Sequence, residues 1–167
     1  MVATPILQRF STKETLTVTN LHSLANDAYW QSAAFTLTDK PFDIHILTAL
    51  STNTSAGSAN GYARVWLAPS LDGTTFAGDA SGTEGSYAPT TPSAAEQSKN
   101  LIPLPIVQMK ADETAARVYE KIHSALAALK GAMPYACSLV IQNKTGQAFA
   151  SSGNLVEVRC IASEFGT

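Results

Sequence analysis

The stretch that decides the fold is residues 137–160, "CSLVIQNKTGQAFASSGNLVEVRC". Apolar residues alternate with polar or small ones in both halves, which is typical of half-buried β-strands. If the two runs form an antiparallel hairpin with Asn143 opposite Asn154, every apolar side chain faces inward and Cys137 faces Cys160. A register slipped by two residues keeps the faces but separates the sulfurs. We therefore expect a closing hairpin whose tip, 144–153, exposes Phe149.

The same period of two recurs along the rest of the chain, which predicts an all-β fold. The further strands are expected at 14–21, 29–37, 42–50, 62–68 and 101–109. Pro103 and Pro105 place the last of these at a sheet edge or beside a bulge, because proline cannot donate to a ladder. Short strands with Gly- and Pro-rich links indicate a β-sandwich.

Two regions lack apolar periodicity. Residues 1–13 are expected to form an N-terminal arm or an irregular start, and 14–167 a single β-sandwich domain. Residues 77–100 are rich in Gly, Ser, Thr and Pro and are expected to form one long loop. Residues 111–134 suit either a helix, which Asp112 could cap and Gly131 could end, or a strand at 114–123.

The composition argues for a protein that is bound by others. Charged residues make up 14% of the chain and hydrophobic residues 45%. This fraction of charged residues is well below the roughly 25% of ordinary soluble domains, and a surface with few charges suits permanent assemblies. The net charge of −2 and the scattered basic residues give no reason to expect nucleic acid or an anionic membrane as partner. No apolar stretch is long enough to span a bilayer, and we see no secretion signal at the N-terminus.

Motifs for chemistry are absent from the sequence. The chain has two cysteines without metal-binding spacing, so they are expected to be buried thiols or, alternatively, a disulfide formed after synthesis. The three histidines are far apart, and Asp43-x-His45 reads as the polar face of a strand. Trp30, Tyr62 and Trp66 could form a sugar-stacking platform, although core packing explains aromatics on strands more simply. We expect no enzyme activity, no metal and no cofactor.

Two segments together resemble a family of small structural proteins of tailed bacteriophages. They are "YARVWLAPSLDGTTFAGD" at 62–79, with its "LAxSxDGTxF" pattern, and "YACSLVIQNKTGQAFASSGNLVEVRCIASE" at 135–164, with its "NxTGxAxASSGN" pattern. The resemblance implies a jelly-roll-like antiparallel β-sandwich found in virions. It also implies a strand around 114–123, and we accordingly expect this strand followed by a short helical turn at 124–129.

The resemblance further implies a function. Such domains act as capsid decoration, or cement, proteins, which would make the major capsid protein the partner. We expect a homo-oligomer, a dimer or trimer, synthesised in the host cytoplasm and placed on the capsid surface. A tail or neck component and a carbohydrate-binding module are the alternatives. The candidate partner contacts are Ile6, Leu7, Arg9 and Phe10 in the arm, Tyr87 in the long loop and Phe149 at the hairpin tip.

Overall fold

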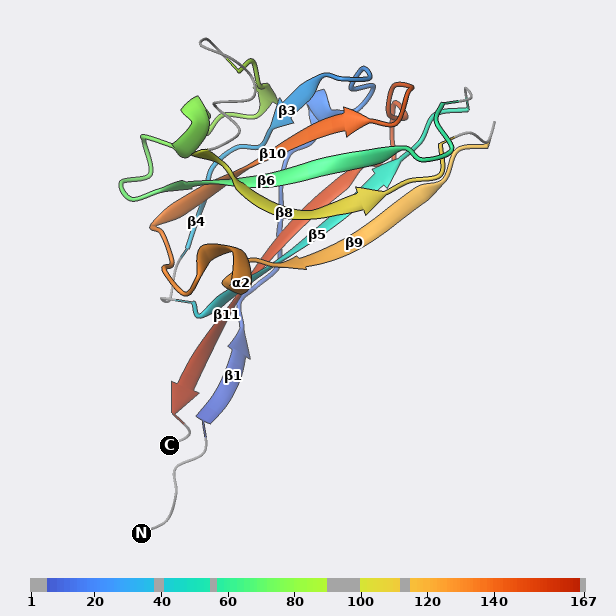
Figure 1. The fold of residues 1–167 in the computed structure, drawn as a ribbon. Coiled ribbons are helices and arrows are strands. Elements are labelled where there is room, and N and C mark those ends of the chain that lie inside the picture. The colour runs from blue at the N-terminus through green and yellow to red at the C-terminus, as the bar shows by residue number, and fades with distance from the viewer. Residues whose placement is uncertain (1–5, 38–40, 55–56, 90–99, 112–114, 166–167) are drawn as a thin grey trace.

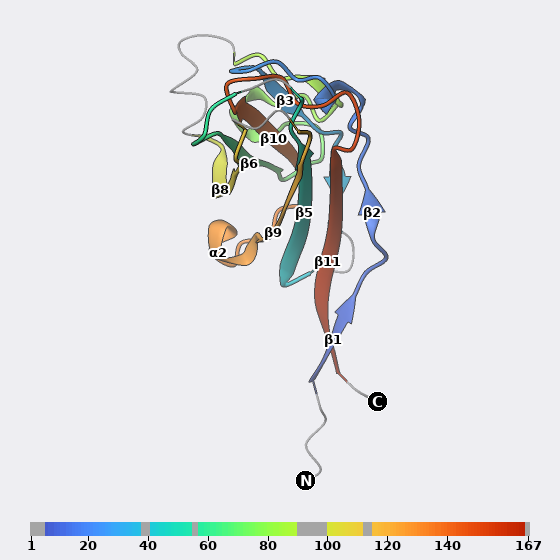
Figure 2. The same cartoon turned by 90° about the vertical axis from the view of Figure 1, so that its right-hand side faces the viewer.

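The computed structural model describes residues 6–37, 41–54, 57–89, 100–111 and 115–165. They form a β-sandwich of two antiparallel sheets (Figures 1 and 2), as the alternating pattern predicted. Sheet A contains β1 (Ile6–Phe10), β2 (Glu14–Thr15), β5 (Asp43–Ser51), β9 (Val118–Ser124) and β11 (Leu155–Phe165). Sheet B contains β3 (Tyr29–Gln31), β4 (Phe35–Thr36), β6 (Tyr62–Ser70), β7 (Gly85–Ser86), β8 (Ile102–Gln108) and β10 (Ala136–Lys144).

The strand order is β1-β11-β5-β9 in sheet A, where β2 also pairs with β11. It is β7-β3-β10-β6-β8 in sheet B, where β4 also pairs with β10. Within the described residues, the strands are connected by the short helices η1 (Thr19–Leu21), η2 (Ala77–Asp79) and α2 (Leu126–Leu129).

The largest core cluster lies between the sheets. It takes Ile44 and Ile46 from β5, Leu67 from β6 and Leu139 and Ile141 from β10, all fully buried. A second cluster lies on the outer face of sheet B, where residues 76–87, which we call the covering segment, place Phe76, Ala80 and Tyr87 against Trp66 and Val140. Strand β10 is therefore buried on both faces, which explains its nearly uninterrupted run of apolar and small residues.

The predicted closing hairpin is wrong. Strands β10 and β11 belong to opposite sheets, and β10 pairs with β6, β3 and β4, whereas β11 pairs with β5, β1 and β2. Period-two alternation identifies the inward side chains of each strand, but a partner can lie beside a strand or across the core from it. Cys137 and Cys160 consequently face the same core from opposite sheets.

Several other expectations are confirmed. The segment at 111–130 contains strand β9 followed by the short helix α2, in agreement with the strand and helical turn that we expected. Strand β8, with its two prolines, is an edge strand of sheet B, and its pairing with β6 has an irregular register between Ala63 and Val65.

Other strands are shorter than predicted. The run at 14–21 forms only β2 before the chain turns into η1, and the run at 29–37 is divided into β3 and β4. The expected faces nevertheless hold, because Leu16, Phe35 and Leu37 are buried in the main core.

Candidate interaction surfaces

The expected N-terminal arm contains a strand. Residues 6–10 form β1, which pairs antiparallel with the last residues of β11, from Ile6 opposite Phe165 to Phe10 opposite Ile161. Strand β5 pairs with β11 only as far as Ile161, so beyond that residue β1 and β11 continue as a two-stranded ribbon. Figures 1 and 2 show this ribbon, defined here as residues 6–10 and 162–165, projecting from the sandwich.

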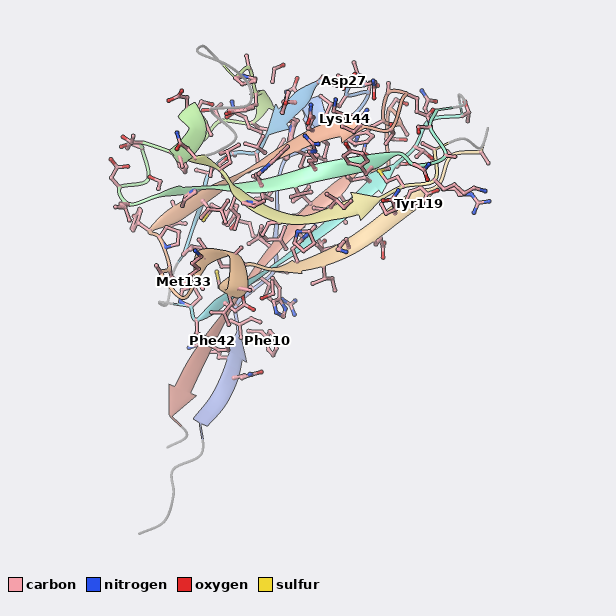
Figure 3. The ribbon with its side chains drawn as sticks, in the orientation of Figure 1. Phe10, Asp27, Phe42, Tyr119, Met133 and Lys144 are labelled. Carbon is pink, nitrogen blue, oxygen red and sulfur yellow. The ribbon has the colours of Figure 1, made fainter. Side chains whose placement is uncertain are left out.

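Two of the predicted arm contacts are exposed on the ribbon. Arg9 is exposed, and the side chain of Phe10 is 51% exposed at the base of the ribbon (Figure 3). The side chains of Ile6 and Leu7 lie outside the described part of the structure, although their backbone pairing with β11 is described. Arg9 and Phe10 are therefore exposed, on a strand that the sequence did not predict.

The outer face of sheet A carries further apolar side chains. Val118 is 54% exposed and Ile122 is 68% exposed on β9, and Ile122 lies directly opposite Leu47 of β5. Phe10 is on the same face, because it pairs with Ile161, which in turn pairs with Asp43. Asp43 lies four residues before Leu47 on β5 and therefore on the same face of the strand. Sequence reasoning missed Val118 and Ile122 as surface residues, since alternation within β9 reveals two faces but not which of them is covered.

Charged groups lie beside the apolar side chains of this face. Lys13 forms an ion pair of 2.6 Å with Glu157, and the Nε2 of His45 lies 3.3 Å from a carboxylate oxygen of Asp43. A shallow hollow of about 260 Å³ lies between these groups, lined by Lys13, His45, Leu47, Ile122, Glu157, Val158 and Arg159. An apolar floor with paired charges at its border resembles the core and rim of a protein–protein interface.

Asp43 is more than part of an exposed polar face. Its side chain is buried and accepts hydrogen bonds from the backbone N–H of Ile44, the hydroxyl of Ser124 and the backbone N–H of Leu126. The last of these bonds satisfies a donor at the start of α2. The expectation of a solvent-exposed polar face is wrong for Asp43, because its buried carboxylate fixes β9 and α2 against β5.

A second hollow, of about 310 Å³, lies at the base of the ribbon. It is lined by Arg9, Phe10, Ser11, Thr12, Glu14, Phe35, Thr36, Val158, Cys160 and Ala162. These residues come from β1, β2 and the segment between them, and from β4 and β11, so the hollow lies where the two sheets separate. It places Cys160 close to the surface while leaving only 9% of the residue exposed.

Tyr87 was predicted as an exposed contact, and this prediction is wrong. Tyr87 is 5% exposed, its ring packs edge-on against Tyr29, and its hydroxyl donates to the carbonyl of Gly78. Burial, together with the negative charge of Asp79, raises the pKa of the Tyr87 hydroxyl. The covering segment is thus a packed layer and not an open loop, whereas residues 90–99 of the predicted loop lie outside the described residues.

Glu84 anchors the covering segment to the rest of the fold. Its carboxylate accepts hydrogen bonds from the indole Nε1 of Trp30 at 2.8 Å and from the backbone and side-chain nitrogens of Asn20 at 2.7 and 2.6 Å. Partial burial opposes ionisation of Glu84, but these hydrogen bonds outweigh it and lower its pKa below the usual value. The carboxylate therefore joins the segment to both η1 and β3.

Phe149 was also predicted to be exposed, and it is fully buried at 0% exposure. The connection from β10 to β11 closes one end of the sandwich, and Phe149 enters the main core there. The side chain of Asn143 accepts from the backbone and hydroxyl of Thr145 and donates to the carbonyls of Leu24 and Gln147. The "NxTGxA" pattern is consequently a buried turn that positions the fold.

The "SxDGTxF" pattern has a structural role as well. The carboxylate of Asp72 accepts from the backbone N–H groups of Thr74 and Thr75 and from the hydroxyl of Ser70. These bonds, with the one to Thr75 contributing most, hold the pKa of Asp72 well below its usual range. The turn delivers Phe76 to the second cluster, so both segments behind the phage resemblance form turns of the fold.

Both cysteines are buried, and neither forms a disulfide in this structure. Burial, with a smaller contribution from Cys160, raises the pKa of the Cys137 thiol to about 12. A neutral thiol is a poor nucleophile, so this arrangement favours packing over reactivity. The disulfide remains the alternative prediction for oxidising conditions.

Trp30 and Trp66 are packed inside the protein, as expected, and do not form the alternative sugar-stacking platform. Trp30 is fully buried with its indole nitrogen bonded to Glu84, and Trp66 is buried in the second cluster, where it stacks on Tyr29 at 6.3 Å between ring centroids. Within the described residues, no three His, Cys, Asp or Glu side chains gather as a metal site would require.

The chain matches no protein-family model and no curated protein. Among the helices of the described ranges, none has the length and apolar character needed to cross a bilayer.

Proposed function

We propose that this chain is a structural protein of a tailed-phage virion, a capsid decoration protein with a jelly-roll sandwich that binds the major capsid protein and stabilises its lattice. The observation that carries the proposal is the order of the strands. It adds to the resemblance of the two turn segments, which by themselves explain only local structure.

The pairing of the strands supports a jelly roll, a fold of viral capsid and lectin domains. If β1 with β2 and β3 with β4 each count as one interrupted strand, the first strand pairs with the last, β11. The second pairs with β10, β5 pairs with β9, and β6 pairs with β8. This nested order is that of one long antiparallel hairpin wrapped around a core, which is how a jelly roll is built.

The surface supports a role in assembly. Val118, Ile122 and Phe10 leave apolar area on the outer face of sheet A, and the ion pair of Lys13 with Glu157 borders it. Apolar side chains exposed on one face of a protein can mark an interaction site. We assign this face, in place of Tyr87 and Phe149, to the contact with the capsid.

A decoration protein acts by mass action. A protein that binds the assembled lattice but not its separated subunits stabilises the lattice, by about 2.7 kcal/mol per site when its free concentration is a hundred times Kd. This role needs neither a catalytic group nor a cofactor. It places the protein on the capsid surface after synthesis in the host cytoplasm.

The test is co-sedimentation of the purified protein with decoration-free capsids of the phage that encodes it, followed by cryo-electron microscopy. We expect saturable binding at regular lattice positions and a higher melting temperature of the capsids. Ile122→Glu should weaken binding by roughly tenfold or more, because it introduces a charge into a desolvated contact. Leu71→Glu is the matched control, since Leu71 is exposed in the turn after β6, away from sheet A.

Density only on the tail or neck would overturn the decoration role and support the alternative position in the virion. Absence of binding to every particle component would overturn the virion role itself. A glycan array would then test the carbohydrate-binding alternative, which the burial of Trp30 and Trp66 does not favour.

A further inference from the structure

Strand β1 presents unpaired backbone at one end of sheet A, and β9 does so at the other end. Of these two strands, β1 is the one that projects beyond the sandwich (Figures 1 and 2). Strand β1 stands at the end of the order of sheet A. Sheet B ends on one side in β8, whose Pro103 and Pro105 hinder pairing with a further strand. It ends on the other side in β7, which is only two residues long. No proline interrupts β1 between residues 6 and 10.

The direction of the backbone groups in β1 follows from its neighbours. The N–H of Ser11 donates to the carbonyl of Cys160 at 2.9 Å, so Ser11 points its N–H toward β11. Across β11, the N–H of Phe42 donates to the carbonyl of Ile161 at 2.8 Å, so this carbonyl points away from β1. Because these directions alternate along an antiparallel pair, Leu7 and Arg9 direct their N–H groups toward β11, whereas Ile6, Gln8 and Phe10 direct theirs outward.

We infer that β1 pairs antiparallel with β1 of a second copy of this chain, around a two-fold axis at Gln8. In this register Gln8 lies opposite Gln8 of the second copy, and Ile6 lies opposite Phe10. Each outward N–H then meets an outward carbonyl of the other strand. A two-fold axis at any other residue of β1 would pair fewer of its five residues, so this register gives the largest number of backbone hydrogen bonds.

The charges fit the same register. Arg9 is the one charged residue of β1, and the two-fold axis places it opposite Leu7 and not opposite the other Arg9. Like charges directly opposite each other in a sheet destabilise the pair, and this register avoids them. The ribbon also leaves room for a partner, because it projects beyond the sandwich (Figure 2).

The pairing would stabilise the ribbon of two strands. A two-stranded ribbon is marginal in water, and pairing two ribbons produces a four-stranded sheet. Sheet A of one copy would continue into sheet A of the other, with their outer faces side by side. The inference specifies the homo-oligomer that the sequence led us to expect as a dimer and does not rest on capsid binding. Its test uses no capsid, so the inference and the proposed function can fail separately.

The test measures the molar mass of the purified chain by light scattering at micromolar concentrations. We expect a dimer for the natural chain and for Gln8→Ala, which keeps the backbone N–H. Gln8→Pro should be a monomer, because it removes an outward donor from the centre of the pair while leaving the bonds to β11 in place. Its unfolding temperature, extrapolated to low protein concentration, should match that of Gln8→Ala.

A cross-link locates the interface independently. Directly opposite residues in a hydrogen-bonded pair have Cα atoms about 5.5 Å apart, a separation that a disulfide can bridge. Gln8→Cys treated with oxidised glutathione should therefore form a covalent dimer, and Leu71→Cys should not. A natural chain that is monomeric or trimeric, a dimer that survives Gln8→Pro, or Gln8→Cys that does not cross-link would overturn the inference.

Discussion

At the scale of single residues, His123 is the most unusual group in the core. It is 1% exposed on β9, its Nε2 lies 3.0 Å from the hydroxyl of Thr48, and its Nδ1 has no hydrogen-bond partner among the described residues. Burial, with a smaller contribution from Lys121, lowers its pKa to about 4. The histidine is thus neutral in the folded protein at pH 7.

This burial predicts a loss of stability in mild acid. The unfolded chain binds a proton at His123 near pH 6.5, whereas the folded chain binds it only near pH 4. The free energy of unfolding should therefore be fully retained above pH 6.5 and fall as the pH drops toward 4, by on the order of 2–3 kcal/mol from this residue. Urea unfolding at a series of pH values measures the slope.

A variant isolates the contribution of His123. His123→Gln should be somewhat less stable at pH 7 because the core is disturbed, but its pH dependence between 6.5 and 4 should be flatter. Equal slopes in the natural chain and His123→Gln would contradict the prediction.

At the scale of elements, the connection from β10 to β11 carries the chain from one sheet to the other. Its turn requires a positive φ of 81° at Gly146, and a Cβ placed there would lie 3.0 Å from the backbone nitrogen of Ser58. Gly153, in the same connection, has a similar φ of 82°, but its nearest neighbour would be 3.6 Å away. The two glycines share a backbone conformation and differ in their surroundings.

Substituting each of these two glycines by alanine separates the cost of backbone strain from the cost of close packing. Gly153→Ala should lose about 1 kcal/mol of unfolding free energy, because an L-residue is strained at positive φ. Gly146→Ala should lose roughly 1–2 kcal/mol more, since the Cβ also presses on the backbone of 57–58. Urea midpoints of the two variants measure the difference, and equal losses would show that the contact with Ser58 is unimportant.

At the scale of the whole molecule, two hydrophobic clusters share one strand. Strand β10 contributes Leu139 and Ile141 to the main core and Val140 to the second cluster, so the covering segment is attached to the central strand of sheet B. The covering segment is held by fewer contacts than β10. Its local opening should therefore require less free energy than global unfolding.

Hydrogen exchange followed by mass spectrometry tests whether the covering segment opens more easily than β10. Peptides from β10 should exchange slowest, at the rate of global unfolding, and the covering segment should be intermediate. The exposed turn at 71–75 should exchange fastest. Exchange of the covering segment as fast as the turn would mean that the second cluster does not stay formed in solution.

Much of the architecture could be predicted from the sequence. The alternation of Ile44 with Ile46 or of Val156 with Val158 identified the inward faces, because the apolar side chains of a strand buried on one side repeat every two residues. Two prolines predicted the edge strand β8 for a local reason, the missing N–H. The phage resemblance, and not propensity, favoured the strand that became β9.

Contacts between distant segments were decided only by the tertiary structure. The sequence by itself determined an all-β sandwich with inward-facing cysteines, since composition and alternation are local properties. The tertiary structure decided that β10 and β11 face each other across the core, that Glu84 anchors the covering segment, and that Tyr87 and Phe149 are buried while Ile122 is exposed. Burial depends on which layer packs on a residue, and no local pattern of side chains contains that information.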